Sequence, residues 1–156
     1  MSENGKFQQG VTAVICAAGK GTRAGFSKNK LLMKTRGYPV LLKTVEAFSL
    51  PEISEILVVV NESDEKEISE LCKAFKTVRI VLGGETRPQT VFNALKETKT
   101  DIVLVHDGAR PYVTKENILG CIESVKTHGS GIVCIPAVDT VAVIDSGKII
   151  SDRERK

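Results

Sequence analysis

Hydrophobic residues along this chain form short runs that alternate with stretches of helical periodicity. The runs are rich in valine and isoleucine, which is typical of strands buried on both faces of a parallel sheet. We expect five such strands, at 11–17, 56–60, 78–82, 102–105 and 131–135. Between them, apolar residues recur every three or four positions, and this pattern predicts helices at 41–48, 64–75, 90–96 and 115–125.

The alternation of strands and helices indicates an α/β fold. We expect a Rossmann-like, doubly wound, mostly parallel sheet with right-handed crossovers and helices on both faces. Two further strands at 140–144 and 148–150, around Ser146-Gly147, predict a C-terminal β-hairpin arm. We divide the 156 residues into a flexible leader (1–10), one main domain (11–137) and the hairpin arm (138–156).

Composition excludes several classes of protein. With 42% hydrophobic and 26% charged residues the chain is globular rather than disordered. No apolar run approaches the roughly 18–20 residues that cross a bilayer, so we expect no membrane partner and a cytoplasmic protein. The four cysteines lie far apart and form no zinc or redox motif. A net charge of +3 and only 4% aromatic residues give little basis for nucleic-acid binding.

The distribution of charge says more than its sum. Seven lysines and arginines and no acidic residue lie between Val11 and Val45, whereas eight acidic residues lie between Glu46 and Glu70. A basic segment of this kind suggests that a polyanion binds there. A merely solvated loop explains the charge count equally well, so the charge alone leaves the two interpretations open.

Ligands of a doubly wound sheet bind at the carboxyl ends of its strands, so the loops there are the candidate site. The loop after the first strand reads Ala-Ala-Gly-Lys-Gly-Thr-Arg from Ala17 to Arg23, and Lys30 follows. Its glycines allow a ligand to approach closely, and successive N–H groups bind phosphate oxygens. The spacing matches neither the Rossmann fingerprint nor the P-loop. With Arg23 and Lys30 behind it, we predict a phosphate-binding loop.

Two further loops carry a resemblance to a known family. The loop after the third strand is G-G-E-T-R-P-Q-T-V (83–91), and the loop after the fourth is V-H-D-G-A-R-P (105–111). Together with A-A-G-x-G-T-R, these motifs resemble the 2-C-methyl-D-erythritol 4-phosphate cytidylyltransferases of the nucleotidyltransferase superfamily. The resemblance runs from about Val11 to Arg153. It implies a nucleotide-diphospho-sugar transferase-like fold and the transfer of CMP from CTP to methylerythritol phosphate, with release of pyrophosphate, in non-mevalonate isoprenoid biosynthesis.

The same resemblance implies roles for individual residues. The residues expected to stabilise the reacting phosphates, as the catalytic groups, are Arg23 and Lys30. Those expected to bind CTP, mainly through the main chain and the hydroxyl of the last, are Ala17, Ala18, Gly19, Gly84, Glu85 and Thr90. Those expected to bind the polyol phosphate are Asp107, Arg110, Thr140 and, from the partner subunit of a homodimer, Arg153. Mg²⁺ is expected on the CTP phosphates, with no protein ligand of its own.

Two neighbours of these motifs are given structural roles. We expect His106 to be a hydrogen-bond donor at a strand end, because an ionised phosphate nucleophile needs no strong general base. We expect Arg87 to orient the Gly84 loop by donating to its carbonyl groups. The sequence also departs from the family pattern at Cys16, where many members have proline, and at Gly108, which replaces an alanine.

Length leaves two alternatives open. Family members continue well beyond the position of Lys156, so the resemblance implies a C-terminally truncated chain with weak CTP binding and little turnover of its own. One alternative is a ribitol 5-phosphate cytidylyltransferase, which shares the three loops and differs in its polyol. The other is a nucleotide-binding module without catalysis, which truncation favours and the retained Arg23, Lys30, Asp107 and Arg110 argue against.

Overall fold

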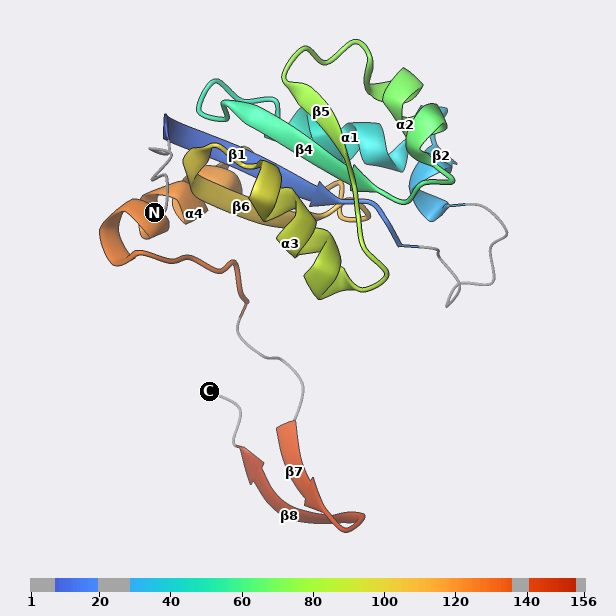
Figure 1. Cartoon of the computed structure of the whole chain (residues 1–156). Coiled ribbons are helices and arrows are strands. Elements are labelled where there is room, and N and C mark those ends of the chain that lie inside the picture. Colours follow the sequence, from blue (N-terminus) through green and yellow to red (C-terminus); the bar gives the residue numbers. More distant parts are fainter. Residues whose placement is uncertain (1–7, 20–28, 136–140, 154–156) are drawn as a thin grey trace, which may run out of the picture.

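A four-stranded parallel sheet forms the centre of the molecule (Figure 1). The computed structural model describes residues 8–19, 29–135 and 141–153. Across the sheet the order is β5 (Val78–Leu82), β4 (Glu55–Val60), β1 (Gln8–Cys16), β6 (Thr100–Asp107). The chain moves outward in one direction from β1 to β5 and then returns to place β6 on the other side of β1. The loops after β1 and β6 therefore flank the point where the strand order reverses, which is where such sheets bind ligands.

Helices cover both faces of the sheet. The helices are α1 (Val40–Phe48), α2 (Glu65–Cys72), α3 (Arg87–Glu97) and α4 (Lys115–His128). Side chains of α1, α2 and α4 pack with one face of the sheet, where Ile15, Ile56 and Val58 are fully buried. Ala94 of α3 packs with Val14 and Leu57 on the opposite face. Successive strand residues point to opposite faces, so these two clusters confirm the doubly wound α/β fold.

One expected strand is absent. The run from Gly131 to Ile135 has the β-branched residues typical of a strand but forms none. Ile132 and Ile135 are 87% and 83% exposed. A strand requires a hydrogen-bonded neighbour, and no described strand pairs with this segment. The prediction of a fifth strand at 131–135 was therefore wrong, because β-branched composition cannot supply the missing partner.

Two hairpins complete the described chain. The first joins β2 (Lys34–Thr35) to β3 (Tyr38–Pro39) through Arg36 and Gly37, both with positive φ. The sequence pattern had not indicated it. The second joins β7 (Val141–Asp145) to β8 (Lys148–Arg153) as a separate antiparallel sheet, and it confirms the expected C-terminal hairpin.

The expected leader falls mostly on residues 1–7, which lie outside the described part of the chain. β1 begins at Gln8, three residues before the predicted start of the main domain. Within the described residues, each helix is too short or too polar to cross a bilayer.

We expect Ile56→Ala to destabilise the protein by about 2–5 kcal/mol, because the side chain is fully buried between the sheet and its helices. Denaturation by urea, followed by circular dichroism, measures this free energy of unfolding. The matched control is Ile149→Ala, which truncates an isoleucine that is 69% exposed on β8 and should change stability by less than about 0.5 kcal/mol. Equal losses for both variants would contradict the assignment of the core.

Candidate functional site

The ends of β1 and β6 lie side by side and place their loops together. In the parallel register Cys16 is aligned with Asp107, and the Gly108 N–H donates to the Cys16 carbonyl at 3.0 Å. A Cβ at Gly108 would lie 3.1 Å from that carbonyl oxygen and 3.3 Å from the Leu31 side chain. A side chain at position 108 would therefore contact both loops tightly, and glycine leaves this space free.

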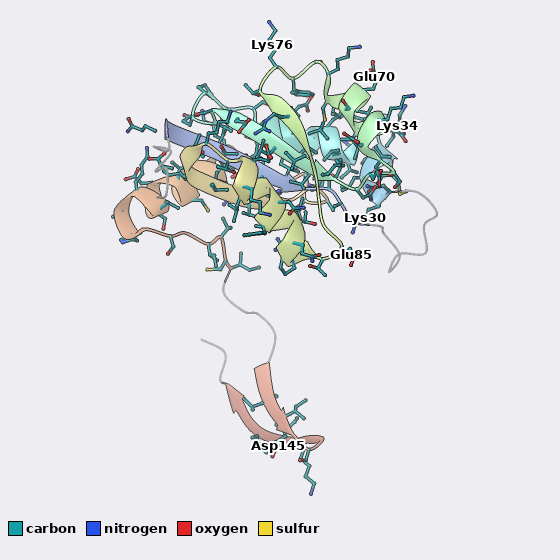
Figure 2. All side chains as sticks on the ribbon, in the orientation of Figure 1. Lys30, Lys34, Glu70, Lys76, Glu85 and Asp145 are labelled. Atoms are coloured by element: carbon teal, nitrogen blue, oxygen red, sulfur yellow. The ribbon has the colours of Figure 1, made fainter. Side chains whose placement is uncertain are left out.

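The loop after β1 presents main-chain groups to solvent. Ala17 is buried and its N–H donates to the Val59 carbonyl at 2.7 Å, whereas Gly19 is exposed. Lys30 begins a short 3-10 helix (Lys30–Leu32), and its side chain is exposed. Figure 2 shows Lys30 and Glu85 toward the same end of the sheet. Arg23 lies outside the described residues, so its place beside Lys30 stays a prediction.

A threonine closes the loop after β5. The Thr90 side chain is 4% exposed, and its hydroxyl accepts from the Gly84 N–H at 3.2 Å and donates to the Gly84 carbonyl at 3.3 Å. This hydroxyl thus holds the loop in place, while one of its lone pairs remains to accept from a ligand. The Glu85 side chain is exposed. Base recognition by Gly84, Glu85 and Thr90 stays a prediction.

Helix α3 begins earlier than the sequence pattern indicated. Thr86 and Gln89 form a capping box, so the helix starts at Arg87 rather than at Thr90. This start places Arg87 in the first turn, within reach of the end of β6. Its guanidinium donates to Asp107 Oδ1 with Nη2 at 3.0 Å. The expectation that Arg87 donates to carbonyls of the Gly84 loop was wrong, because the carboxylate of Asp107 is its described partner.

Asp107 is held between two arginines. Arg87 Nη2 contacts Oδ1 at 3.0 Å, and Arg110 Nε contacts Oδ2 at 3.1 Å. Burial raises the pKa of the Asp107 carboxyl, but the hydrogen bond and charge of Arg87 and the charge of Arg110 outweigh burial and hold that pKa below its ordinary value. The carboxylate is consequently ionised at neutral pH and acts only as an acceptor. The structure therefore brings the predicted pair Asp107 and Arg110 together and adds Arg87 to it.

His106 contributes packing beside this cluster. Its ring lies 4.9 Å from the Phe48 ring, and its buried Nδ1 has no partner among the described residues. Burial is the main cause that lowers the pKa of His106. The imidazole is thus neutral at neutral pH, and the structure shows no Nδ1 hydrogen bond of the kind expected from a structural donor.

A groove of about 800 Å³ runs beside β6. Arg87, Asp107 and Arg110 line it together with apolar residues, among them Phe48 and Ile132. This volume is within the range of small-ligand sites, which place a few polar groups on a mostly apolar wall. The three charged residues give the groove one region suited to hydroxyl and phosphate groups.

The structure does not test the other two predicted polyol-binding residues. Thr140 lies outside the described residues, and Arg153 is the last residue of β8, in register with Val141. Their contact with substrate stays a prediction. In the described ranges no three His, Cys, Asp or Glu side chains gather into a group that could hold a metal ion.

Sequence reasoning missed three polar residues behind the loop after β1. Asn29 donates to the Ala17 carbonyl at 3.2 Å and to Asp64 Oδ2 at 2.7 Å, and Asn61 donates to the Ala18 carbonyl at 3.4 Å. A signal for Asn61 was available, because it directly follows a buried parallel strand. Nothing in the local pattern indicated that Asn29 would be buried.

Comparison with known proteins identifies a matching family and related sequences. The family model described as 2-C-methyl-D-erythritol 4-phosphate cytidylyltransferase matches residues 11–156. A curated relative of that name from Bacillus licheniformis is 40% identical over 147 residues, which are 91% of this chain and 64% of the relative. Another from Bacillus thuringiensis is 35% identical over 92% of this chain and 66% of the relative. The chain thus spans about two thirds of the length of these curated relatives.

Solved structures agree with the sequence comparison. The crystal structure of a 4-diphosphocytidyl-2C-methyl-D-erythritol synthase from Anaerococcus prevotii superposes with a TM-score of 0.84 at 30% identity, covering 94% of this chain and 65% of that one. A 2-C-methyl-D-erythritol 4-phosphate cytidylyltransferase from Francisella tularensis gives a TM-score of 0.72 at 29% identity, covering 95% and 67%.

Replacing Arg87 by glutamine should raise the pKa of Asp107 toward or above its ordinary value of 3.8, because the effect of burial is then opposed only by the charges of Arg110 and His106. A carboxyl group whose pKa is lowered in the folded state stabilises the fold at any pH above its ordinary pKa. This stabilisation is lost as the pH falls through the lowered pKa. Arg87→Gln should therefore shrink the loss of stability on acidification. Carbon NMR titration of the Asp107 carboxyl measures the pKa directly.

The matched control is Arg79→Gln, which removes the ion pairs of an arginine with Glu55 and Glu97 on the sheet's other edge. It should leave the Asp107 titration unchanged. An Asp107 pKa that stays at its wild-type value in Arg87→Gln would show that the 3.0 Å contact does not persist in solution.

Proposed function

Because this chain belongs to the 2-C-methyl-D-erythritol 4-phosphate cytidylyltransferase family, we propose that it forms the nucleotide site and part of the polyol site of an enzyme that transfers CMP from CTP to 2-C-methyl-D-erythritol 4-phosphate. Pyrophosphate is the second product. The observation that carries the proposal is the pairing of Gly108 with Cys16, which sets an ionised Asp107 next to a loop of exposed main-chain groups. One loop suits phosphates and the other suits a polyol.

In the proposed reaction a phosphate oxygen of the polyol phosphate attacks the α-phosphorus of CTP. The new P–O bond forms as the bond from the α-phosphorus to the bridging oxygen breaks, and that oxygen leaves with pyrophosphate. The attacking oxygen is already ionised, so the step needs no strong general base. Lys30 and Arg23 stabilise the negative charge that builds on the phosphate oxygens, and their ammonium and guanidinium groups do so without transferring a proton.

Asp107 and Arg110 are proposed to hold the polyol. Oδ1 of the Asp107 carboxylate accepts a hydrogen bond from Arg87, Oδ2 forms an ion pair with Arg110, and both oxygens keep a lone pair for a substrate hydroxyl. Arg110 uses Nε for Asp107, which leaves its exposed terminal N–H groups for a phosphate oxygen. Thr140 and a partner subunit's copy of the β8 arginine, Arg153, complete this part of the proposal.

Mg²⁺ belongs to the same proposal, and the donor set fits an ion held by the nucleotide. Both oxygens of Asp107 are engaged by arginines, and the described residues offer no cluster of metal ligands. Mg²⁺ prefers octahedral oxygen coordination and commonly takes it from phosphates and water. The ion would supply charge neutralisation on the triphosphate, while Lys30 and Arg23 act on the same oxygens.

We also propose that the enzyme is a cytoplasmic homodimer. Apolar side chains of the β7–β8 hairpin, including Ile144, Ile149 and Ile150, are exposed within the described chain. Burial of this surface against a second copy would stabilise both hairpins.

Calorimetric titration tests the proposal most directly. We expect CTP with Mg²⁺ to bind this chain and ATP to bind at least about tenfold more weakly. Pyrophosphate release, followed with methylerythritol phosphate and with ribitol 5-phosphate in a form extended to the length of the relatives, identifies the polyol. Faster turnover of ribitol 5-phosphate would favour a ribitol 5-phosphate cytidylyltransferase. CTP binding without turnover of either polyol would favour the nucleotide-binding module.

Lys30→Ala, in the same extended form, should lower kcat by about 10²–10³ while raising the KM for CTP much less, because the ammonium acts on charge that develops in the transition state. Steady-state kinetics with varied CTP separates the two constants. Lys34→Ala is the matched control, since it removes a nearby exposed lysine of β2. A change confined to KM would remove Lys30 from the catalytic role.

Asp107→Asn should leave Mg²⁺-CTP binding within a few-fold of wild type and lower kcat/KM for methylerythritol phosphate at least about tenfold, or about 1.4 kcal/mol. The amide cannot accept from substrate and both arginines as an ionised carboxylate does. Asp145→Asn, in the β7–β8 hairpin, is the control for the same substitution elsewhere. Loss of CTP binding in Asp107→Asn would instead assign Asp107 to the nucleotide site.

A further inference from the structure

Two asparagine side chains hold consecutive carbonyl groups of the loop after β1. Asn29 Nδ2 donates to the Ala17 carbonyl at 3.2 Å, and Asn61 Nδ2 donates to the Ala18 carbonyl at 3.4 Å. The two asparagines belong to different parts of the chain. Asn29 precedes the 3-10 helix, and Asn61 follows β4. Each asparagine therefore holds one of two consecutive peptide groups.

Anchoring a carbonyl also sets the direction of the next N–H. Every peptide bond among the described residues is trans, so the N–H of each residue points opposite to the carbonyl of the residue before it. With the Ala17 and Ala18 carbonyls turned toward the asparagines, the N–H groups of Ala18 and Gly19 point away from them. Ala18 is half-buried and Gly19 is exposed, so these N–H groups lie where a ligand can reach the loop.

The Asn29 side chain is itself held on three sides. Its exposed fraction is 6%, its Nδ2 also donates to Asp64 Oδ2 at 2.7 Å, and its Oδ1 accepts from the Leu31 N–H at 3.1 Å. The last bond caps the 3-10 helix whose first residue is Lys30. One buried amide thus links the loop after β1 to the backbone that carries Lys30.

Asp64 joins the two asparagines into one network. Its carboxylate accepts from Asn29, and its N–H donates to Asn61 Oδ1 at 3.1 Å. Asp64 also stands at the N-cap position of α2, where its carbonyl accepts from the Ile68 N–H at 2.9 Å. Because α2 packs on the sheet through the fully buried Ile68, the network rests on the core.

We propose that Asn29, Asn61 and Asp64 are positioning residues that direct the N–H groups of Ala18 and Gly19 toward phosphate oxygens of the nucleotide and set Lys30 beside them. The inference rests on the proposed function, since it assigns the ligand of those N–H groups to the nucleotide's phosphates. The network touches neither the Gly84 loop nor Asp107, so it acts on phosphate binding and leaves recognition of the base to the loop after β5.

The decisive variant is Asn29→Asp, which keeps the size of the side chain and removes the donor. The Ala17 carbonyl loses its partner, and a second carboxylate faces Asp64. Calorimetry on this 156-residue chain should show pyrophosphate and Mg²⁺-CTP binding weakened about tenfold or more, with cytidine affinity unchanged. Asn117→Asp, which adds the same charge in the capping box of α4, should leave all three affinities at wild-type values.

A double variant separates positioning from repulsion. In Asn29→Asp with Asp64→Asn, a donor and an acceptor face each other again, so thermal stability should return toward wild type. The Ala17 carbonyl still has no donor, so pyrophosphate binding should stay weak. Full recovery of pyrophosphate binding in the double variant would overturn the proposal, because charge repulsion alone would then explain the single variant.

An amide readout tests the positioning without any nucleotide. In ¹H–¹⁵N spectra Asn29→Asp and the double variant should both shift the Ala18 and Gly19 amide resonances relative to Asn117→Asp. Unchanged resonances, or a loss of cytidine affinity as large as that of CTP, would overturn the proposal. Failure of the unsubstituted chain to bind either CTP or pyrophosphate would instead count against the proposed function, and the amide shifts would still decide whether the network orients the loop.

Discussion

The site depends on the close parallel pairing of β1 with a strand on each side. In that pairing Cys16 is aligned with both Val59 and Asp107, so three chain segments leave the sheet at the same level. Every polar main-chain group at this edge then needs a partner, because burial of an unpaired amide or carbonyl is costly. The Ala17 N–H uses Val59, the Cys16 carbonyl uses Gly108, and the next two carbonyls use asparagines. The N–H groups of Ala18 and Gly19 remain, and we propose that these face a ligand.

Charged side chains also gather at this edge of the sheet. One ionised carboxylate lies between two guanidinium groups, so the cluster of Asp107, Arg87 and Arg110 keeps a net positive charge. A positive cluster beside exposed N–H groups attracts anions, and both proposed substrates carry phosphate. Asp107 also links two parts of the chain, because it pairs with Arg87 of α3 and with Arg110 of its own loop.

The sequence predicted the elements that local pattern determines. β5 at 78–82 has the predicted bounds, and α1 and α4 begin within one residue of their predicted starts. The family and its three loops were recognisable because their motifs are contiguous. The predictions that were wrong concern features that depend on residues distant in the sequence. The segment 131–135 has strand-like residues but no described strand beside it, and the contact of Arg87 with Asp107 joins residues 20 positions apart. Asn29 could not be found because its partners Ala17 and Asp64 are distant from it in the sequence.

The position of β6 at the border of the sheet bears on how this chain behaves when it is prepared alone. Its outer backbone groups pair with no described strand, and Val105 on it and Ile132 nearby expose apolar surface. Such a border is a template for adding a strand from another molecule. We expect concentrated samples of this chain to self-associate along this edge, and dilution to favour the monomer.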